Sequence, residues 1–375
     1  MSGRRRGATL ARRLVILLIL LPVVLLGTVI ARILLVPVIA PDSYDALRSH
    51  LDRELPALME RHGVPGAAMT LVHDGDVWVQ GYGSADTGTG RRVAADTVFQ
   101  AASVSKSVSA WGVMRLVEQG EFGLDVPVSR YLTRWRLPPS AFDPEGVTVR
   151  RFLSHTAGLS VGGYLGYDPA VALPSLETEL SVGGDAAGPD GAVRVVYPPG
   201  EEVHYSGGGY TLLQLLVEEV SGRSFAEYMG QQVLAPLGMT QSTFEWSPGV
   251  REAIATPYRT DGTVLPQFRF AAKAAGGLYT TAPDLARFVA ATMGGRGAPR
   301  GGGVLAPGTL DLMLSSAPGA TITMGPLRVG ANGLGYAIHP ILLGGGASSS
   351  GTMAAIRAGR RRSWPCRPNG RAWSS

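Results

Sequence analysis

Ser103-Val104-Ser105-Lys106 decides how this chain is interpreted, because it sets an amine three residues after a hydroxyl. The chain holds only two lysines, Lys106 and Lys273, and fills its other basic positions with arginine. A buried lysine can lose its proton, whereas arginine stays charged in proteins. Residues at i and i+3 share one face of a helix, so Lys106 can accept the hydroxyl proton of Ser103. The alternative is a helix start with a solvated lysine, and other motifs must decide.

Several downstream segments support a catalytic interpretation of Ser-x-x-Lys. His204-Tyr205-Ser206-Gly207-Gly208-Gly209-Tyr210 precedes an apolar stretch of helical character, residues 211–222. With Ser-x-x-Lys, this segment resembles the serine β-lactamase and penicillin-binding-protein superfamily, in its class C β-lactamase-like branch. The resemblance covers roughly residues 44–338, and its other segments follow in the family's order: 116–132, 153–159, 198–200, 237–244, 275–288 and 332–336.

The resemblance implies a fold and a site. The fold is α/β and β-lactamase/transpeptidase-like, with an antiparallel sheet flanked by helices and a mostly helical subdomain. Ser103 is then the nucleophile that forms an acyl-enzyme, and Lys106 takes its proton. Tyr205 relays a proton to the leaving group and activates water. Ser206 and Gly207 are assigned to substrate binding, and no cofactor or metal is expected.

Two departures from the family pattern affect this assignment. The family's second motif usually reads Tyr-x-Asn, and here position 207 is glycine. The third motif, Lys/His-x-Gly on an inner strand, is absent after Asn332-Gly-Leu-Gly-Tyr336. Residues 339–375 are arginine-rich, and Pro340 is a poor residue for a central strand. We expect these residues to form an atypical, disordered tail that lacks the family's last strands and closing helix, as after a frame-shift or truncation.

The formal net charge of the whole chain, +5, differs in sign from the charge of the predicted domain. Six arginines lie in residues 1–41 and seven in residues 312–375, neither with any acid, so residues 42–311 carry a net charge of −8. An acidic domain argues against a nucleic-acid-binding surface. Cys366 is the only cysteine, which excludes an intramolecular disulfide, and the six histidines show no metal-ligand spacing.

The N-terminus predicts a membrane segment. Residues 1–13 are a basic tail, and residues 14–31 carry no charge over a length close to the ~20 residues that span a bilayer. With its continuation to residue 40 it is interpreted as a single-pass signal-anchor that keeps the basic tail cytoplasmic and the domain outside. The alternative is a cleaved signal peptide with residues 38–40 as the cleavage site, which Pro41 disfavours.

Periodicity and turn residues predict the local structure. Helices are expected over 44–62, from Ser103 to about residue 118, over 210–220 and over 283–293, and strands over 66–73 and 77–82, with a long loop over 162–199. Trp111 and Met114 are assigned to the core. His155 is assigned to a buried turn beneath the site. Gly158-Leu-Ser160-Val-Gly162 matches the Gly-x-Ser-x-Gly elbow, but no helical pattern follows it, so Ser160 is the weaker nucleophile candidate.

The sequence therefore predicts a membrane-anchored serine hydrolase that works outside the cytoplasm through an acyl-serine intermediate. Its partners would be the membrane and a small-molecule or peptide acyl substrate, such as an ester, an amide or a D-amino-acid peptide of the cell wall. The alternative is a catalytically impaired penicillin-binding-like protein that keeps the fold and holds a ligand, which Gly207 and the missing third motif favour.

Overall fold

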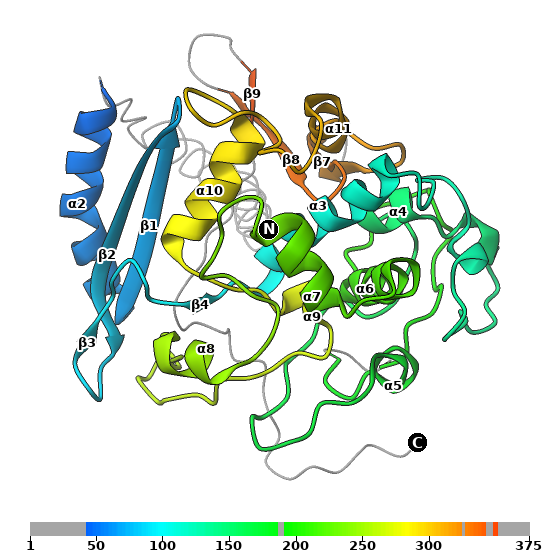
Figure 1. The fold of residues 1–375 in the computed structure, drawn as a ribbon, viewed down its shortest axis with the longest axis horizontal. Coiled ribbons are helices and arrows are strands. Elements are labelled where there is room, and N and C mark those ends of the chain that lie inside the picture. Colours follow the sequence, from blue (N-terminus) through cyan, green and yellow to red (C-terminus); the bar gives the residue numbers. More distant parts are fainter. Residues whose placement is uncertain (1–42, 187–190, 325–326, 343–347, 352–375) are drawn as a thin grey trace, which may run out of the picture. The chain divides into compact units, whose positions relative to one another are not determined.

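The structure is a computed structural model and describes residues 43–186, 191–324, 327–342 and 348–351 (Figure 1). The chain divides into two compact units, Met1–Glu54 and Leu55–Ser375. The described part of the first unit is residues 43–54, which begin helix α2 (Tyr44–Arg61) close to its predicted bounds. The predicted basic tail and membrane segment, residues 1–40, lie outside the described residues. The fold and the site described below belong to the second unit.

An antiparallel hairpin opens the second unit. Strands β1 (Gly66–His73) and β2 (Asp76–Asp86) pair from Gly66↔Gly83 to His73↔Asp76, and β3 (Arg91–Arg92) extends this sheet. The turn needs left-handed backbone at Asp74 (φ 47°) and Gly75 (φ 88°), which these residue types tolerate. The hairpin prediction is thus confirmed, although β2 runs four residues past its predicted end because its far part pairs with β3.

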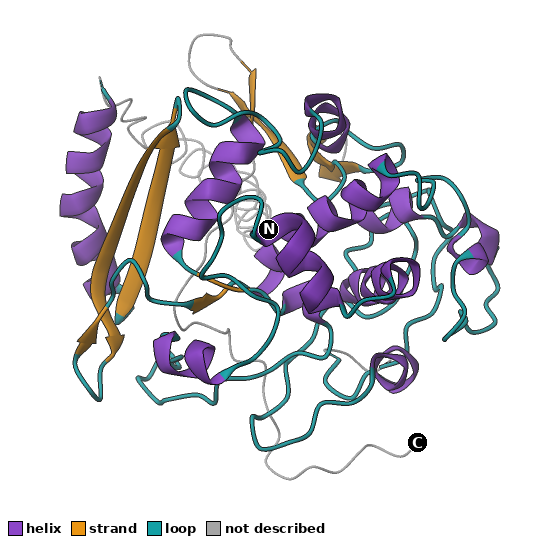
Figure 2. Cartoon of the chain, in the orientation of Figure 1, coloured by secondary structure: helices purple, strands orange, loops and turns teal. Residues whose placement is uncertain are grey.

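Helix α10 (Ala282–Met293) packs against β1, and Figure 2 shows the helix lying beside the hairpin. The hydroxyl of Thr281 caps it by accepting from the Asp284 N–H. Shorter helical segments outside the central core helices are α4 (Val149–Leu153), α5 (Leu176–Val182), α7 (Phe225–Met229), η4 (Gly230–Leu234), α8 (Pro248–Ala253) and α11 (Pro307–Met313), and short 3-10 turns include Val128–Arg130 and Pro144–Gly146. Helix α5 falls in the stretch predicted as loop.

The largest core lies around helices α3 (Ser105–Glu118), α6 (Gly207–Ser221) and α9 (Lys273–Gly276). Trp111 and Met114 are buried in it, as predicted. The segment 332–336 also contacts this core. The hydroxyl of Tyr336 accepts a 2.8 Å bond from the Trp111 indole, and a Cβ on Gly335 (φ 83°) would lie 2.3 Å from the Cβ of Ala110. A glycine at 335 is therefore what lets this segment approach α3.

The described strands form three antiparallel sheets. Besides β1–β2–β3, β4 (Phe99–Gln100) pairs with β5 (Tyr279–Thr280). The third sheet has the order β6 (Thr321–Met324), β7 (Leu327–Asn332), β8 (Ala337–Leu342) and β9 (Ser348–Gly351). The pair β4–β5 is short, but β4 ends three residues before Ser103 and so helps to place it.

Strands β8 and β9 depart from the expectation of a strandless tail after residue 338. Residues 339–342 of β8 pair with 348–351 of β9, and His339 lies in β8. Pairing with β7 uses only residues 337 and 338, so Pro340 has a partner strand on one side alone, where proline is tolerated. Backbone pairing does not need the side-chain alternation that the tail lacks. The expectation that no closing helix follows concerns residues 352–375, which lie outside the described residues.

Candidate active site

Ser103 lies at the exposed start of the central helix. It is the middle residue of a 3-10 turn, Ala102–Val104, that continues into α3. Ala102 adopts a left-handed φ of 46°, which costs energy for a residue with a side chain. The N–H of buried Ala101 donates to the carbonyl of Leu278 at 2.8 Å and anchors the turn. The α-helix begins two residues later than predicted, because this turn presents the serine.

Lys106 is the buried partner of Ser103. Its side chain is 5% exposed, and its Nζ lies 3.3 Å from Ser103 Oγ and donates to the carbonyl of Ala275 at 2.7 Å. Burial lowers the pKa of Lys106, and the nearby hydroxyl of Tyr205 opposes this lowering. A larger share of neutral amine is therefore present next to the serine than on a solvated lysine. The alternative of a solvated lysine at position 106 is wrong.

Tyr205 reaches the same serine from the segment before α6. Its hydroxyl donates to Ser103 Oγ at 2.9 Å, across 102 positions of sequence. Half of the side chain is exposed, and the Lys106 Nζ lies 5.0 Å from the centre of its ring. The three predicted catalytic residues therefore meet at one atom, Ser103 Oγ, with the amine buried and the phenol open to a ligand.

His155 holds the Tyr205 segment in place. It turns the chain with a φ of 60°, its Nδ1 accepts from the N–H of Ser206 at 3.1 Å, and its carbonyl accepts from the N–H of His204 at 2.8 Å. Its ring lies 4.4 Å from that of Tyr205. Burial and the charge of Lys106 lower the pKa of His155 to about 3, so its imidazole is neutral and can accept. The prediction of a structural turn beneath the site is confirmed.

Contacts within the fold account for the residue types at Ser206 and Gly207. The buried Ser206 hydroxyl accepts from the Gly209 N–H at 3.0 Å and so caps α6, and it donates to the carbonyl of Ser160 at 2.8 Å. A Cβ on Gly207 would lie 3.2 Å from the ring of Tyr164, so this ring occupies the space beside position 207. The Ser206 hydroxyl is thus engaged in the fold, and substrate binding by this pair stays a prediction.

Ser160 is a structural residue. Its hydroxyl donates to the carbonyl of Ala192 at 2.8 Å and accepts from the N–H of Arg194 at 3.0 Å. These bonds fasten the two ends of the loop to each other, and no helix follows Ser160. It therefore lacks the strand-turn-helix setting of an elbow nucleophile. Within the described residues, no three acidic, histidine or cysteine side chains gather as a metal site would require.

A buried carboxyl pair, Glu179 in α5 and Asp185 just after it, could not be expected from any residue pattern. Glu179 is fully buried and Asp185 is 8% exposed, and each has an oxygen without a hydrogen-bond partner. The hydroxyl of Tyr167 donates to Glu179, and Asp185 accepts from the N–H of Gly166 at 2.7 Å. Burial raises the pKa of Asp185 to about 8, helped by its hydrogen bond with Glu179 and by the charge there. Asp185 therefore keeps its proton at neutral pH.

This pair predicts a pH dependence of stability. Asp185 keeps its proton up to about pH 8 when folded and loses it near 3.8 when unfolded. The folded state binds more protons across this window, so the free energy of unfolding falls as pH rises through it. Asp185→Asn removes the titrating group, so urea unfolding should show the variant gaining stability relative to wild type between pH 5 and pH 9. Asp76→Asn, at an exposed carboxylate, is the control. Parallel profiles for Asp185→Asn and wild type would contradict the prediction.

Comparisons with known proteins agree with this geometry. The family model described as Beta-lactamase matches residues 51–363. Penicillin-binding protein 4 of Amycolatopsis lactamdurans is 30% identical over 300 residues, which are 78% of this chain and 75% of that protein. Esterase EstB of Burkholderia gladioli is 32% identical over 219 residues, 56% of this chain and 54% of the esterase. The D-alanine carboxypeptidase AmpC of Burkholderia cenocepacia superposes with a TM-score of 0.62 at 24% identity, over 85% of each chain.

The chain therefore belongs to the Beta-lactamase family, whose members include penicillin-binding proteins and related esterases. Its fold is the β-lactamase/transpeptidase-like one, as the superposed structure shows. Both the resemblance and the fold predicted from the motifs are confirmed. The family is one of serine hydrolases, and the part played by each site residue in this chain stays a prediction.

Proposed function

We propose that this protein is a serine hydrolase that forms an acyl-enzyme on Ser103. One observation carries the proposal. Ser103 Oγ lies 3.3 Å from the Nζ of Lys106 and 2.9 Å from the hydroxyl of Tyr205, and the lysine has a pKa lowered by burial. An exposed serine between a buried amine and an open phenol has the geometry of an activated nucleophile with a proton relay.

The steps follow from these contacts. Neutral Lys106 takes the hydroxyl proton while Ser103 Oγ bonds to the carbonyl carbon of the substrate. The tetrahedral intermediate then collapses, its bond to the leaving group breaks, and the Tyr205 hydroxyl supplies the leaving group's proton. The protonated Lys106 restores the proton of Tyr205. A water molecule attacks the acyl carbon, gives its proton to the same pair, and Ser103 is released with its hydroxyl restored.

Gly207 bears on the choice of substrate. The asparagine side chain that the family usually carries at this position is absent, and the ring of Tyr164 lies beside the glycine. A ligand therefore finds no amide there to bind its own side-chain carbonyl. This favours esters or simple acyl peptides over β-lactams, and the similarity to an esterase supports the same choice.

We also propose that the domain is anchored in the cell membrane and works on its outer side, on acyl substrates that include cell-wall peptides. The support is the basic tail 1–13 followed by the uncharged stretch 14–31, which continues as apolar residues 33–40 after Arg32. Both lie outside the described residues. In the part of the chain that the structure describes, no helix is long and apolar enough to cross a bilayer.

The proposal is tested on the purified full chain by intact mass after exposure to an activated ester and to benzylpenicillin. We expect an adduct on the wild-type protein and on Ser160→Ala, and none on Ser103→Ala. Circular dichroism confirms that each variant is folded. An adduct that persists in Ser103→Ala would overturn the assignment. A folded wild-type protein with neither adduct nor ester turnover would instead favour the binding-protein alternative.

A further inference from the structure

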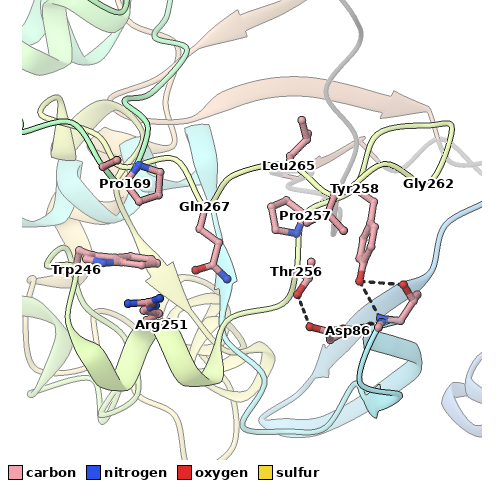
Figure 3. Close-up of a pocket in the computed structure, with 14 residues that line it drawn as sticks. Asp86, Pro169, Trp246, Arg251, Thr256, Pro257, Tyr258, Gly262, Leu265 and Gln267 are labelled. Carbon is pink, nitrogen blue, oxygen red and sulfur yellow. Dashed lines mark hydrogen bonds between the residues drawn. The ribbon is translucent and has the colours of Figure 1, made fainter.

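A cavity lies apart from Ser103. It has a volume of about 680 Å³ and is formed by the turn after β2, the helix α8 and the segment 256–267 (Figure 3). Neither Ser103, Lys106 nor Tyr205 lines it. Figure 3 shows Trp246, Arg251 and Gln267 on one side of the cavity, with Thr256 and Pro257 facing them.

Arg251 places a guanidinium on the wall of this cavity. Its side chain is exposed and makes no ion pair with any described residue. Glu245, which precedes Trp246 in the chain, is paired with Lys273. Asp86, which also lines the cavity, already accepts from the N–H groups of Gly88 and Thr89 and from the hydroxyl of Thr256. The lining thus carries one carboxylate, which neighbouring groups already engage, and one guanidinium, which has no hydrogen-bond or ion-pair partner among the described residues.

Trp246 supplies a fixed apolar surface next to that charge. Its ring lies 5.5 Å from that of Tyr279 and packs against the buried cluster that contains Val250 and Ile254. Pro169 and Leu265 add apolar wall to the same cavity. The ring cannot swing away without losing these contacts, so its surface is available to a ligand at a low entropic cost.

Gln267 completes the polar side. Its amide forms no hydrogen bond within the described part of the chain, and Figure 3 shows it between Trp246 and Pro257. An amide donor next to a guanidinium suits a carboxylate, which accepts several hydrogen bonds at once. Neutral polar ligands would leave the guanidinium without a counter-charge.

We propose that this cavity binds a small organic carboxylate that carries an apolar ring. The carboxylate pairs with Arg251 and accepts from the Gln267 amide, and the ring packs against Trp246. The site is separate from Ser103, and no bond of the ligand is broken there.

The test is a titration of the full chain with benzoate and with benzamide, its uncharged analogue, followed by ligand NMR. We expect benzoate to bind about tenfold more tightly than benzamide, as one charge-assisted contact allows. Arg251→Gln should remove this difference, whereas Arg136→Gln, at an exposed arginine outside the cavity, should keep it. Trp246→Leu should weaken both ligands.

A parallel assay with p-nitrophenyl acetate separates this site from Ser103. Arg251→Gln should keep ester hydrolysis within about twofold of wild type, because it touches none of the proposed catalytic residues. Equal affinity of the wild-type protein for the two ligands, or no binding of either, would overturn the proposal. The same holds if Arg136→Gln removes the preference, or if folded Arg251→Gln loses ester hydrolysis.

Discussion

Replacing Lys106 with methionine is expected to slow the acylation of Ser103 by about 10²–10⁴-fold, the usual contribution of a positioned base. Methionine keeps the apolar stem of the buried side chain but removes the amine that lies 3.3 Å from Ser103 Oγ. The carbonyl of Ala275 also loses its donor, so the melting temperature must be measured with the rate. The rate is followed as burst kinetics with an activated ester.

Lys106→Arg separates a base from a mere positive charge. Arginine keeps the charge but stays protonated, so it should lose acylation as methionine does. Because burial lowers the pKa of Lys106, the wild-type rate should rise with pH and level off below 10.5, the ordinary lysine value. Lys273→Met, at the only other lysine, is the matched control and should acylate normally. A normal rate in Lys106→Arg would show that the lysine acts through its charge.

The spacing of the first motif was enough to place its two side chains. Residues at i and i+3 share a face whether the turn is 3-10 or α, so Ser103 and Lys106 meet although the α-helix begins only at Ser105. The carbonyl of Ala275, which holds the amine, could not be predicted. It is a backbone atom that lies 169 positions away, and no residue type encodes it.

Tyr205 and Gly207 show the limit of the motif resemblance. The resemblance grouped Tyr205 with Ser103, and the two side chains lie 2.9 Å apart, while the role of Tyr205 stays a prediction. For Gly207, the resemblance showed only that the residue departs from the family's Tyr-x-Asn motif. The ring of Tyr164 beside that position comes from a loop with no periodic pattern, so only the folded chain shows what stands there.

The C-terminal strands were missed for a different reason. Sequence patterns predict strands from alternating side chains, and the stretch after residue 338 has no such alternation. The ladder between β8 and β9 uses backbone groups, which any residue except proline supplies fully. Pro340 is accommodated because β7 pairs only with the start of β8.

Replacing Tyr205 with phenylalanine is expected to slow release of the acyl group by about 10²–10⁴-fold, so that the acyl-enzyme accumulates. The ring keeps its place, since its contacts with His155 and with the Lys106 amine involve the ring itself. Only the hydroxyl that lies 2.9 Å from Ser103 Oγ is lost. Intact mass measured over time after mixing with an activated ester should show a long-lived adduct.

Tyr197→Phe is the matched control for this experiment, because Tyr197 is also half exposed and its ring stacks on His204 at 3.7 Å. It should turn over as wild type does. An unchanged rate of release in Tyr205→Phe would show that Lys106 alone activates the water. Slow acylation together with fast release would assign the hydroxyl to the leaving group only. A long-lived adduct in Tyr205→Phe, with none formed in Lys106→Met, would divide the reaction between the two residues. The buried amine would then deprotonate Ser103 for acylation, and the exposed phenol would activate the water that hydrolyses the acyl-enzyme.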